Sequence, residues 1–65
     1  MTYNLSEREK EVLELLTLGY TNNEISKKLS VVVDTTKAHI SAILDKMCVE
    51  NRIQAAIKAI KEGVV

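Results

Sequence analysis

The feature that most constrains this chain is a local pattern of helix starts. Ser6-Glu7-Arg8-Glu9 and Thr21-Asn22-Asn23-Glu24 both have the order of a capping box. In a capping box the first side chain accepts a hydrogen bond from the backbone N–H three residues later, and the glutamate there accepts one from the first residue's N–H. Asn51-Arg52-Ile53-Gln54 is a similar start nearer the C-terminus. The sequence therefore predicts helices that begin at these positions.

Apolar residues at helical spacing follow the first two starts. Gly19 can take the left-handed conformation that ends a helix, so we place the first helix at about residues 7–18. Ile25 and Leu29 support a short second helix at about residues 22–29. The apolar stripe of the first helix consists of Val12, Leu13, Leu15 and Leu16.

Two further apolar patterns predict the remaining helices. Spacing of i, i+3, i+4, i+7 predicts a third helix at about residues 34–47. A fourth is expected at about residues 52–62, with Gly63 at its end. The residues that we expect each helix to bury are Ile40, Ile43, Leu44 and Met47 in the third, and Ile53, Ala56, Ile57 and Ile60 in the fourth.

The segment Ser30-Val31-Val32-Val33 favours extended backbone because it has three consecutive β-branched residues. A strand needs a partner, and the chain offers none. We interpret the segment as the turn between the second and third helices, with at least one valine in the core.

Composition agrees with an all-α fold, a four-helix bundle. The chain has 65 residues, 46% of them hydrophobic, with no proline and two glycines. A β-sandwich or barrel would need turn residues at short intervals. We expect a single domain over residues 1–65 with an aliphatic core.

Several classes of function are disfavoured. One cysteine and one histidine make neither an internal disulfide nor a four-ligand zinc site, and we expect a reducing cytoplasmic location. No apolar run approaches the length of a spanning helix, and the N-terminus is too polar for a signal peptide. Neither a glycine-rich phosphate loop nor a catalytic partner for His39 is present. We expect no enzyme, no metal and no cofactor.

A short helix, a tight turn and a longer helix make a helix-turn-helix, whose second helix can lie in the DNA major groove. On a helical wheel, the face of residues 34–47 opposite the apolar stripe is centred on Ala38, Ala42 and Asp45. Small alanines allow close approach to DNA, and flanking cations can reach phosphates or purine acceptors. The flanks are Lys37 and Ser41 on one side, and His39 and Lys46 on the other. His39 is interpreted as a phosphate donor that also packs.

Four motif blocks sharpen this interpretation. They are Leu5-Ser6-Glu7-Arg8-Glu9; Gly19-Tyr20-Thr21-Asn22-Asn23-Glu24-Ile25; Thr35-Thr36-Lys37-Ala38-His39-Ile40; and Asn51-Arg52 with Ala55-Ala56. Together they resemble the LuxR/FixJ-type helix-turn-helix domain, without an apparent gap over residues 5–63. The resemblance implies the C-terminal output domain of response regulators and related transcriptional regulators. It also implies double-stranded DNA as partner, the third helix as reader, weak homodimerisation through the fourth helix, and RNA polymerase as a further partner.

The resemblance implies roles at matching positions. Lys37, Ala38 and Ser41 match positions that face base edges or nearby phosphates. Thr35 and the backbone of Thr21, Asn22 and Asn23 match phosphate-contacting sites. Lys27 and Lys28 match a basic pair beside the DNA backbone.

Three residues depart from the family pattern around the reader helix. Val32 stands where serine commonly caps the helix, and a missing cap costs ~1 kcal/mol. Thr36 stands where an aliphatic residue is usual, so its buried hydroxyl is expected to bond back to a carbonyl such as that of Val32. Cys48 replaces a glycine at a left-handed position. If Asp34 is the cap instead, the reader helix begins two residues later.

Two interpretations remain open at this stage. Glu9 and Arg52 both match family hallmarks at first turns, and we expect them to form an ion pair. The formal net charge is zero, which is low for a DNA-binding domain, and Asp34 and Asp45 oppose the cations of the reader helix. A helical protein-interaction module without DNA binding is therefore the alternative function.

Overall fold

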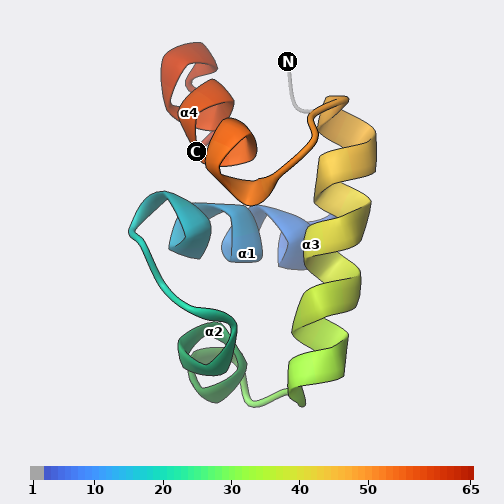
Figure 1. Ribbon diagram of the computed structural model, residues 1–65, viewed down its shortest axis with the longest axis vertical. Coiled ribbons are helices and arrows are strands. Elements are labelled where there is room, and N and C mark those ends of the chain that lie inside the picture. Colours follow the sequence, from blue (N-terminus) through green and yellow to red (C-terminus); the bar gives the residue numbers. More distant parts are fainter. Residues whose placement is uncertain (1–2) are drawn as a thin grey trace.

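The computed structural model describes residues 3–65, which form four helices joined by short turns (Figure 1). The predicted four-helix, all-α architecture is confirmed, since no strand occurs within this range. Every predicted helix agrees with the structure to within one residue at each end. The helices are α1 (Glu7–Thr17), α2 (Asn22–Leu29), α3 (Val33–Met47) and α4 (Arg52–Glu62).

The predicted caps account for three of the helix starts. The Ser6 Oγ accepts from the Glu9 N–H at 3.1 Å and the Glu9 carboxylate accepts from the Ser6 N–H at 2.9 Å. Thr21 and Glu24 make the same reciprocal pair, at 3.2 and 2.8 Å. At α4 the Asn51 Oδ1 accepts from the Gln54 N–H at 2.9 Å, but Gln54 accepts from Glu50 rather than from Asn51. The first two starts are complete capping boxes, and the third is half of one.

The ends of α2 and α3 use left-handed residues that are not glycine. Cys48 ends α3 with φ of 57°, as its place in the sequence predicts. Ser30 ends α2 in the same conformation, with φ of 58°, which the sequence did not signal. A non-glycine residue in this region carries a steric cost at its Cβ. Both turns therefore hold a small amount of strain on either side of α3.

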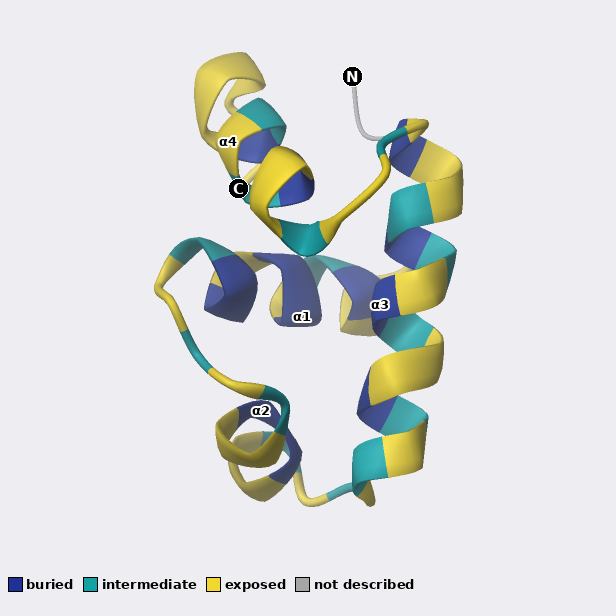
Figure 2. Cartoon of the chain, viewed as in Figure 1, coloured by how far each residue is buried: buried dark blue, intermediate teal, exposed yellow. Residues whose placement is uncertain are grey.

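α1 lies at the centre of the molecule. It packs against α3 and α4, and α2 packs against α3 (Figure 1). α2 and α4 lie on opposite sides of α1 in this view. The buried faces of the helices turn towards one another around α1 (Figure 2). The buried apolar residues are Leu5, Val12, Leu13, Leu15, Leu16, Ile25, Ile40, Ile43, Met47, Ala55 and Ala59.

The buried stripe predicted for α4 was wrong. Ile53, Ile57 and Ile60 are 68%, 51% and 63% exposed, whereas Ala55 and Ala59 are fully buried. Small side chains at the contact let α4 approach α1 closely, and this approach turns the isoleucines outwards. α4 therefore carries an uncovered apolar face.

The turn before α3 also differs from expectation. Val32 is 68% exposed, and Val31 and Val33 are only half-buried, so none of the three valines joins the buried core. Val32 is the N-cap of α3 and offers no side-chain hydrogen bond. The alternative with Asp34 as the N-cap was wrong, because Val32 holds that position and α3 begins at Val33.

Candidate nucleic-acid interface

Two buried hydroxyls join the helices of the helix-turn-helix. The Ser26 Oγ donates to the Asn22 carbonyl at 2.8 Å and lies 2.8 Å from the Thr36 Oγ1. Since Ser26 has a single hydroxyl proton, Thr36 must donate to Ser26. The expected bond from Thr36 to the Val32 carbonyl was wrong, because a partner on the neighbouring helix satisfies the hydroxyl. The Ser26–Thr36 bond fixes α3 relative to α2.

The outer face of α3 presents small and polar residues. Lys37, Ala38, Ser41 and Asp45 are exposed, and Ala42 is half-buried. The face predicted from periodicity is therefore the exposed one. Ile40, Ile43 and Met47 are buried on the other side, with Thr36. Lys37 carries the one cationic side chain among these four exposed residues, and Asp34 adds a carboxylate at the helix start.

The N-terminus of α2 lies beside this face. Thr21, Asn22 and Asn23 line one groove together with Lys37 of α3. The N–H groups of Asn22 and Asn23 are in the first turn of α2, so they have no acceptor within their own helix. Unpaired N–H groups at a helix N-terminus attract anions such as phosphate. The structure thus brings four of the predicted contact residues to one edge.

The remaining predicted contacts are spread more widely. Lys27 and Lys28 are exposed in the last turn of α2, and Lys27 borders a second depression with Asn23 beside the turn before α3. Thr35 and His39 are half-buried on α3. Six predicted residues line neither groove: Lys28, Thr35, Ala38, His39, Ser41 and Lys46.

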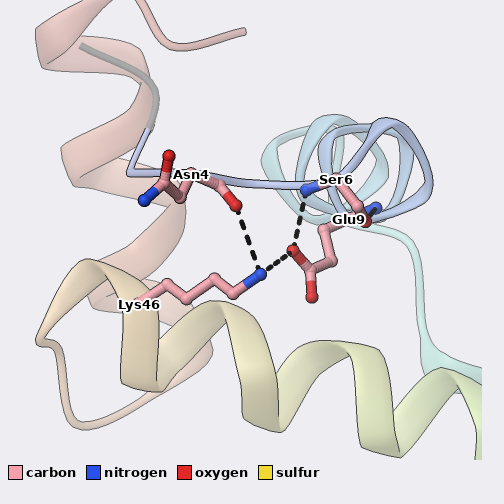
Figure 3. Close-up of polar contacts among 4 residues, drawn as sticks. All are labelled: Asn4, Ser6, Glu9 and Lys46. Atoms are coloured by element: carbon pink, nitrogen blue, oxygen red, sulfur yellow. Dashed lines mark hydrogen bonds and ion pairs between the residues drawn. The ribbon is translucent and has the colours of Figure 1, made fainter.

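The Lys46 ammonium contacts two groups of this same domain. Its Nζ donates to the Glu9 carboxylate at 2.8 Å and to the Asn4 carbonyl at 3.2 Å (Figure 3). The bond from Lys46, with a second from the Ser6 N–H, holds the pKa of the Glu9 carboxyl below its ordinary value. The predicted Glu9–Arg52 pair was wrong, because Lys46 takes that place. DNA contact by Lys46 stays a prediction, and it would compete with this ion pair.

Arg52 makes a contact that the sequence did not reveal. Its Nη2 donates to the Tyr20 carbonyl at 2.9 Å, and its Nη1 donates to the Asn22 Oδ1. The first residue of α4 is thereby bonded to the start of α2. The available signal was an arginine in a helix first turn, where the helix dipole disfavours a cation. That unfavourable placement favours a hydrogen-bonding partner for the arginine, but it does not identify the partner.

Among residues 3–65, no group of three or more His, Cys, Asp or Glu side chains is placed to hold a metal ion. No helix in the same range combines the length and apolarity needed to cross a bilayer.

A short helix bonded through a buried hydroxyl to a longer one, with an exposed face of small and polar residues, defines the class of helix-turn-helix DNA-binding domains. Similarity to a known family supports the same class of protein. Residues 3–59 match the family described as GerE: bacterial regulatory proteins, luxR family, and this chain belongs to that family. It is a DNA-binding domain of the kind found in transcriptional regulators.

Individual relatives are similar over nearly the whole chain. The transcriptional regulatory protein DegU of Brevibacillus brevis is 48% identical over 61 residues, which are 94% of this chain and 26% of DegU. The response regulator protein VraR of Staphylococcus aureus is 41% identical over 61 residues, 94% of this chain and 29% of VraR. The solved structure of the transcription factor GerE superposes with a TM-score of 0.84 at 33% identity, covering 92% of this chain and 90% of that one. The chain thus spans less than a third of the length of DegU and of VraR.

Proposed function

We propose that this domain binds double-stranded DNA sequence-specifically to regulate transcription, with α3 in the major groove. The observation that carries the proposal is the exposed face of Lys37, Ala38 and Ser41, of which Lys37 lines a groove with the first turn of α2. A helix with small side chains at its centre can approach base edges closely. The alanine face of α3 meets this requirement.

The proposed contacts divide by chemistry. Lys37 and Ser41 can read base edges or bind nearby phosphates, whereas Ala38 provides close approach. The start of α2 holds one phosphate through backbone N–H groups. The other proposed backbone contacts are Lys27, Lys28, Thr35 and His39. Lys46 would join them only by releasing Glu9.

The test begins with selection of bound sequences from a random duplex library. On the selected site, Lys37→Ala should lower affinity about tenfold with an unchanged melting midpoint, because the side chain is exposed. Ala38→Glu should lower it further, since it places a carboxylate at the centre of the face. Glu14→Ala, on the exposed side of α1, is the control. Parent-like binding by Ala38→Glu would move the interface to another face.

Self-association through α4 belongs to the same proposal. Ile53, Ile57 and Ile60 leave an apolar face on α4 that one domain does not cover. An apolar patch of this kind favours symmetric pairing of two copies, and two copies suit a site with two half-sites. Pairing would offset the weak binding expected of a domain with zero net charge.

Sedimentation at increasing concentration tests the pairing. The parent should show concentration-dependent association, which a two-half-site duplex should strengthen. Ile57 lines the same groove as Thr21 and Lys37, so the test uses an uncharged substitution there. Ile57→Gln should abolish association and leave single half-site binding intact. Lys61→Gln, at an exposed residue of α4 that does not line the groove, is the control. A parent that stays monomeric both free and on the long duplex would contradict the proposed dimer.

The setting of the domain is part of the proposal. Residues 1–65 act as one DNA-binding domain, working in the cytoplasm as the output module of a regulator. The similarity to a short part of DegU and of VraR supports this role. Contact with RNA polymerase stays a prediction.

A further inference from the structure

Arg52 lies where α4, the helix of the proposed pairing, meets the start of α2, the proposed phosphate contact. It is the first residue of α4, and its guanidinium reaches the Tyr20 carbonyl and the Asn22 side chain. Tyr20 directly precedes the cap of α2, and Asn22 is the first residue of that helix. The two contacts therefore bracket Thr21, the residue at which α2 begins.

This contact joins two helices that otherwise meet mainly through α3. α2 packs against α3, whereas α4 packs against α1 and α3. Within residues 3–65, no other side-chain hydrogen bond or ion pair connects α4 to the start of α2. Arg52 is thus the polar link between the first turn of α4 and the start of α2 in the described chain.

The charge of Arg52 is not neutralised by a carboxylate. In the described part of the chain, no acidic oxygen lies within 4.0 Å of its guanidinium, although three other ion pairs form there. The guanidinium instead lies at the positive ends of α2 and α4, where helix dipoles oppose a cation. Its positive charge adds to that of the α2 N-terminus, at the edge of a domain whose net charge is zero. A phosphate at this edge would complete the charge balance.

We infer that Arg52 is a positioning residue for the phosphate contact of α2. It holds the first turn of α2 so that the Asn22 and Asn23 N–H groups meet one DNA phosphate, and it supplies positive charge behind them. The inference rests on the proposed DNA binding and names a residue of α4 that acts on the interface through α2. The guanidinium itself stays bonded to Tyr20 and Asn22.

The test compares Arg52→Lys and Arg52→Met with the parent on a single selected half-site, where pairing through α4 cannot contribute. Lysine keeps the charge but loses the planar fork, so affinity should fall about threefold to fivefold. Methionine loses both, and affinity should fall about tenfold or more. Because phosphate contacts carry no sequence information, both variants should lose the same factor on an unrelated duplex. Arg8→Lys and Arg8→Met, at an exposed arginine of α1, are the matched controls.

A second measurement separates positioning from general destabilisation. Duplexes are prepared in which one phosphate at a time is replaced by a neutral methylphosphonate. The parent should lose affinity about tenfold at the phosphate that α2 holds, and Arg52→Met should lose less than about twofold there. The ratio is taken within one variant, so any unfolded fraction cancels.

The outcomes are distinct. A parent that binds no duplex would overturn the proposed function itself. If the parent binds and Arg52→Met keeps the parent's full methylphosphonate profile, the positioning role is overturned. Parent-like affinity of Arg52→Lys would also overturn it, since charge alone would then suffice. A loss confined to two-half-site duplexes would place Arg52 in self-association instead.

Discussion

At the scale of single residues, Val32 leaves the start of α3 without a side-chain cap. It is the N-cap of α3, yet it has no hydrogen-bonding side chain and is 68% exposed. The first N–H groups of α3 therefore lack the side-chain acceptor that Ser6 and Thr21 give to α1 and α2. The neighbouring left-handed Ser30 adds strain to the same turn.

Val32→Ser should raise stability, because it supplies a cap and removes little buried surface. The expected gain is ~1 kcal/mol. For a domain of this size, that gain raises the melting midpoint by roughly 4 to 8 °C. Val32→Ala, which trims the side chain without adding an acceptor, is the control. A lower midpoint for Val32→Ser would mean that the valine side chain contributes packing that its exposure does not reveal.

The burial of Thr36 could be predicted from the sequence, but its hydrogen-bond partner could not. Its burial was predictable from its place on the helical wheel, and the structure confirms full burial. Its partner was not predictable, because Ser26 lies ten residues away on a different helix. A wheel shows which way a side chain points and contains no information about the helix that it meets.

At the scale of elements, the Glu9–Lys46 pair ties α1 to α3. Glu9 has a nearly buried side chain, 10% exposed, and serves both the capping box of α1 and the ammonium of Lys46. The same contact reaches the Asn4 carbonyl before α1 (Figure 3). One carboxylate thus supports a helix start and a helix–helix contact at once.

This arrangement predicts an acid-dependent loss of stability. The pKa of Glu9 is lowered in the folded protein, so the folded state binds the proton less tightly than the unfolded state does. The contribution is complete above the ordinary glutamate pKa of about 4.3 and is lost as pH falls through the lower folded value. Glu9→Gln should therefore reduce stability at pH 7 and flatten its decline in acid.

Urea unfolding between pH 7 and pH 3 measures the effect. Glu11→Gln, at an exposed position of α1, is the control and should keep the parent's pH dependence. If Glu9→Gln follows the parent's curve at every pH, the pair contributes nothing to folding.

The helix bounds could be predicted, but the rotation of α4 could not. Capping boxes and end residues lie within a few residues of one another, so the sequence states where helices begin and end. The side that α4 buries depends on how closely it approaches α1, and Ala55 and Ala59 allow an approach that the isoleucine pattern conceals. The same limit applies to Arg52, whose partners lie 30 and 32 residues away.

At the scale of the whole molecule, balanced charge should control DNA affinity. The nine basic residues equal the nine acidic ones, so steering must come from a few cations near α2 and α3. Lys46 is paired with Glu9, which leaves Lys27, Lys28 and Lys37 as the exposed lysines there.

Binding to a single half-site should therefore weaken steeply with salt. With about three phosphates neutralised, a plot of log affinity against log salt should have a slope of about −3. Affinity would fall about fiftyfold between 50 and 200 mM salt, measured by fluorescence anisotropy with a labelled duplex. An affinity independent of salt would favour the alternative of a protein-interaction module.

The central position of α1 also has a consequence for the order of folding. α1 and α4 are separated by most of the chain, so their contact closes the longest loop and is expected to form late. The local boxes at Ser6 and Thr21 need no distant partner and can form early. In refolding followed by circular dichroism, Ser6→Ala should mainly slow folding, whereas Ala59→Gly should mainly accelerate unfolding. The reverse pattern would mean that α4 docks before the helices it covers are formed.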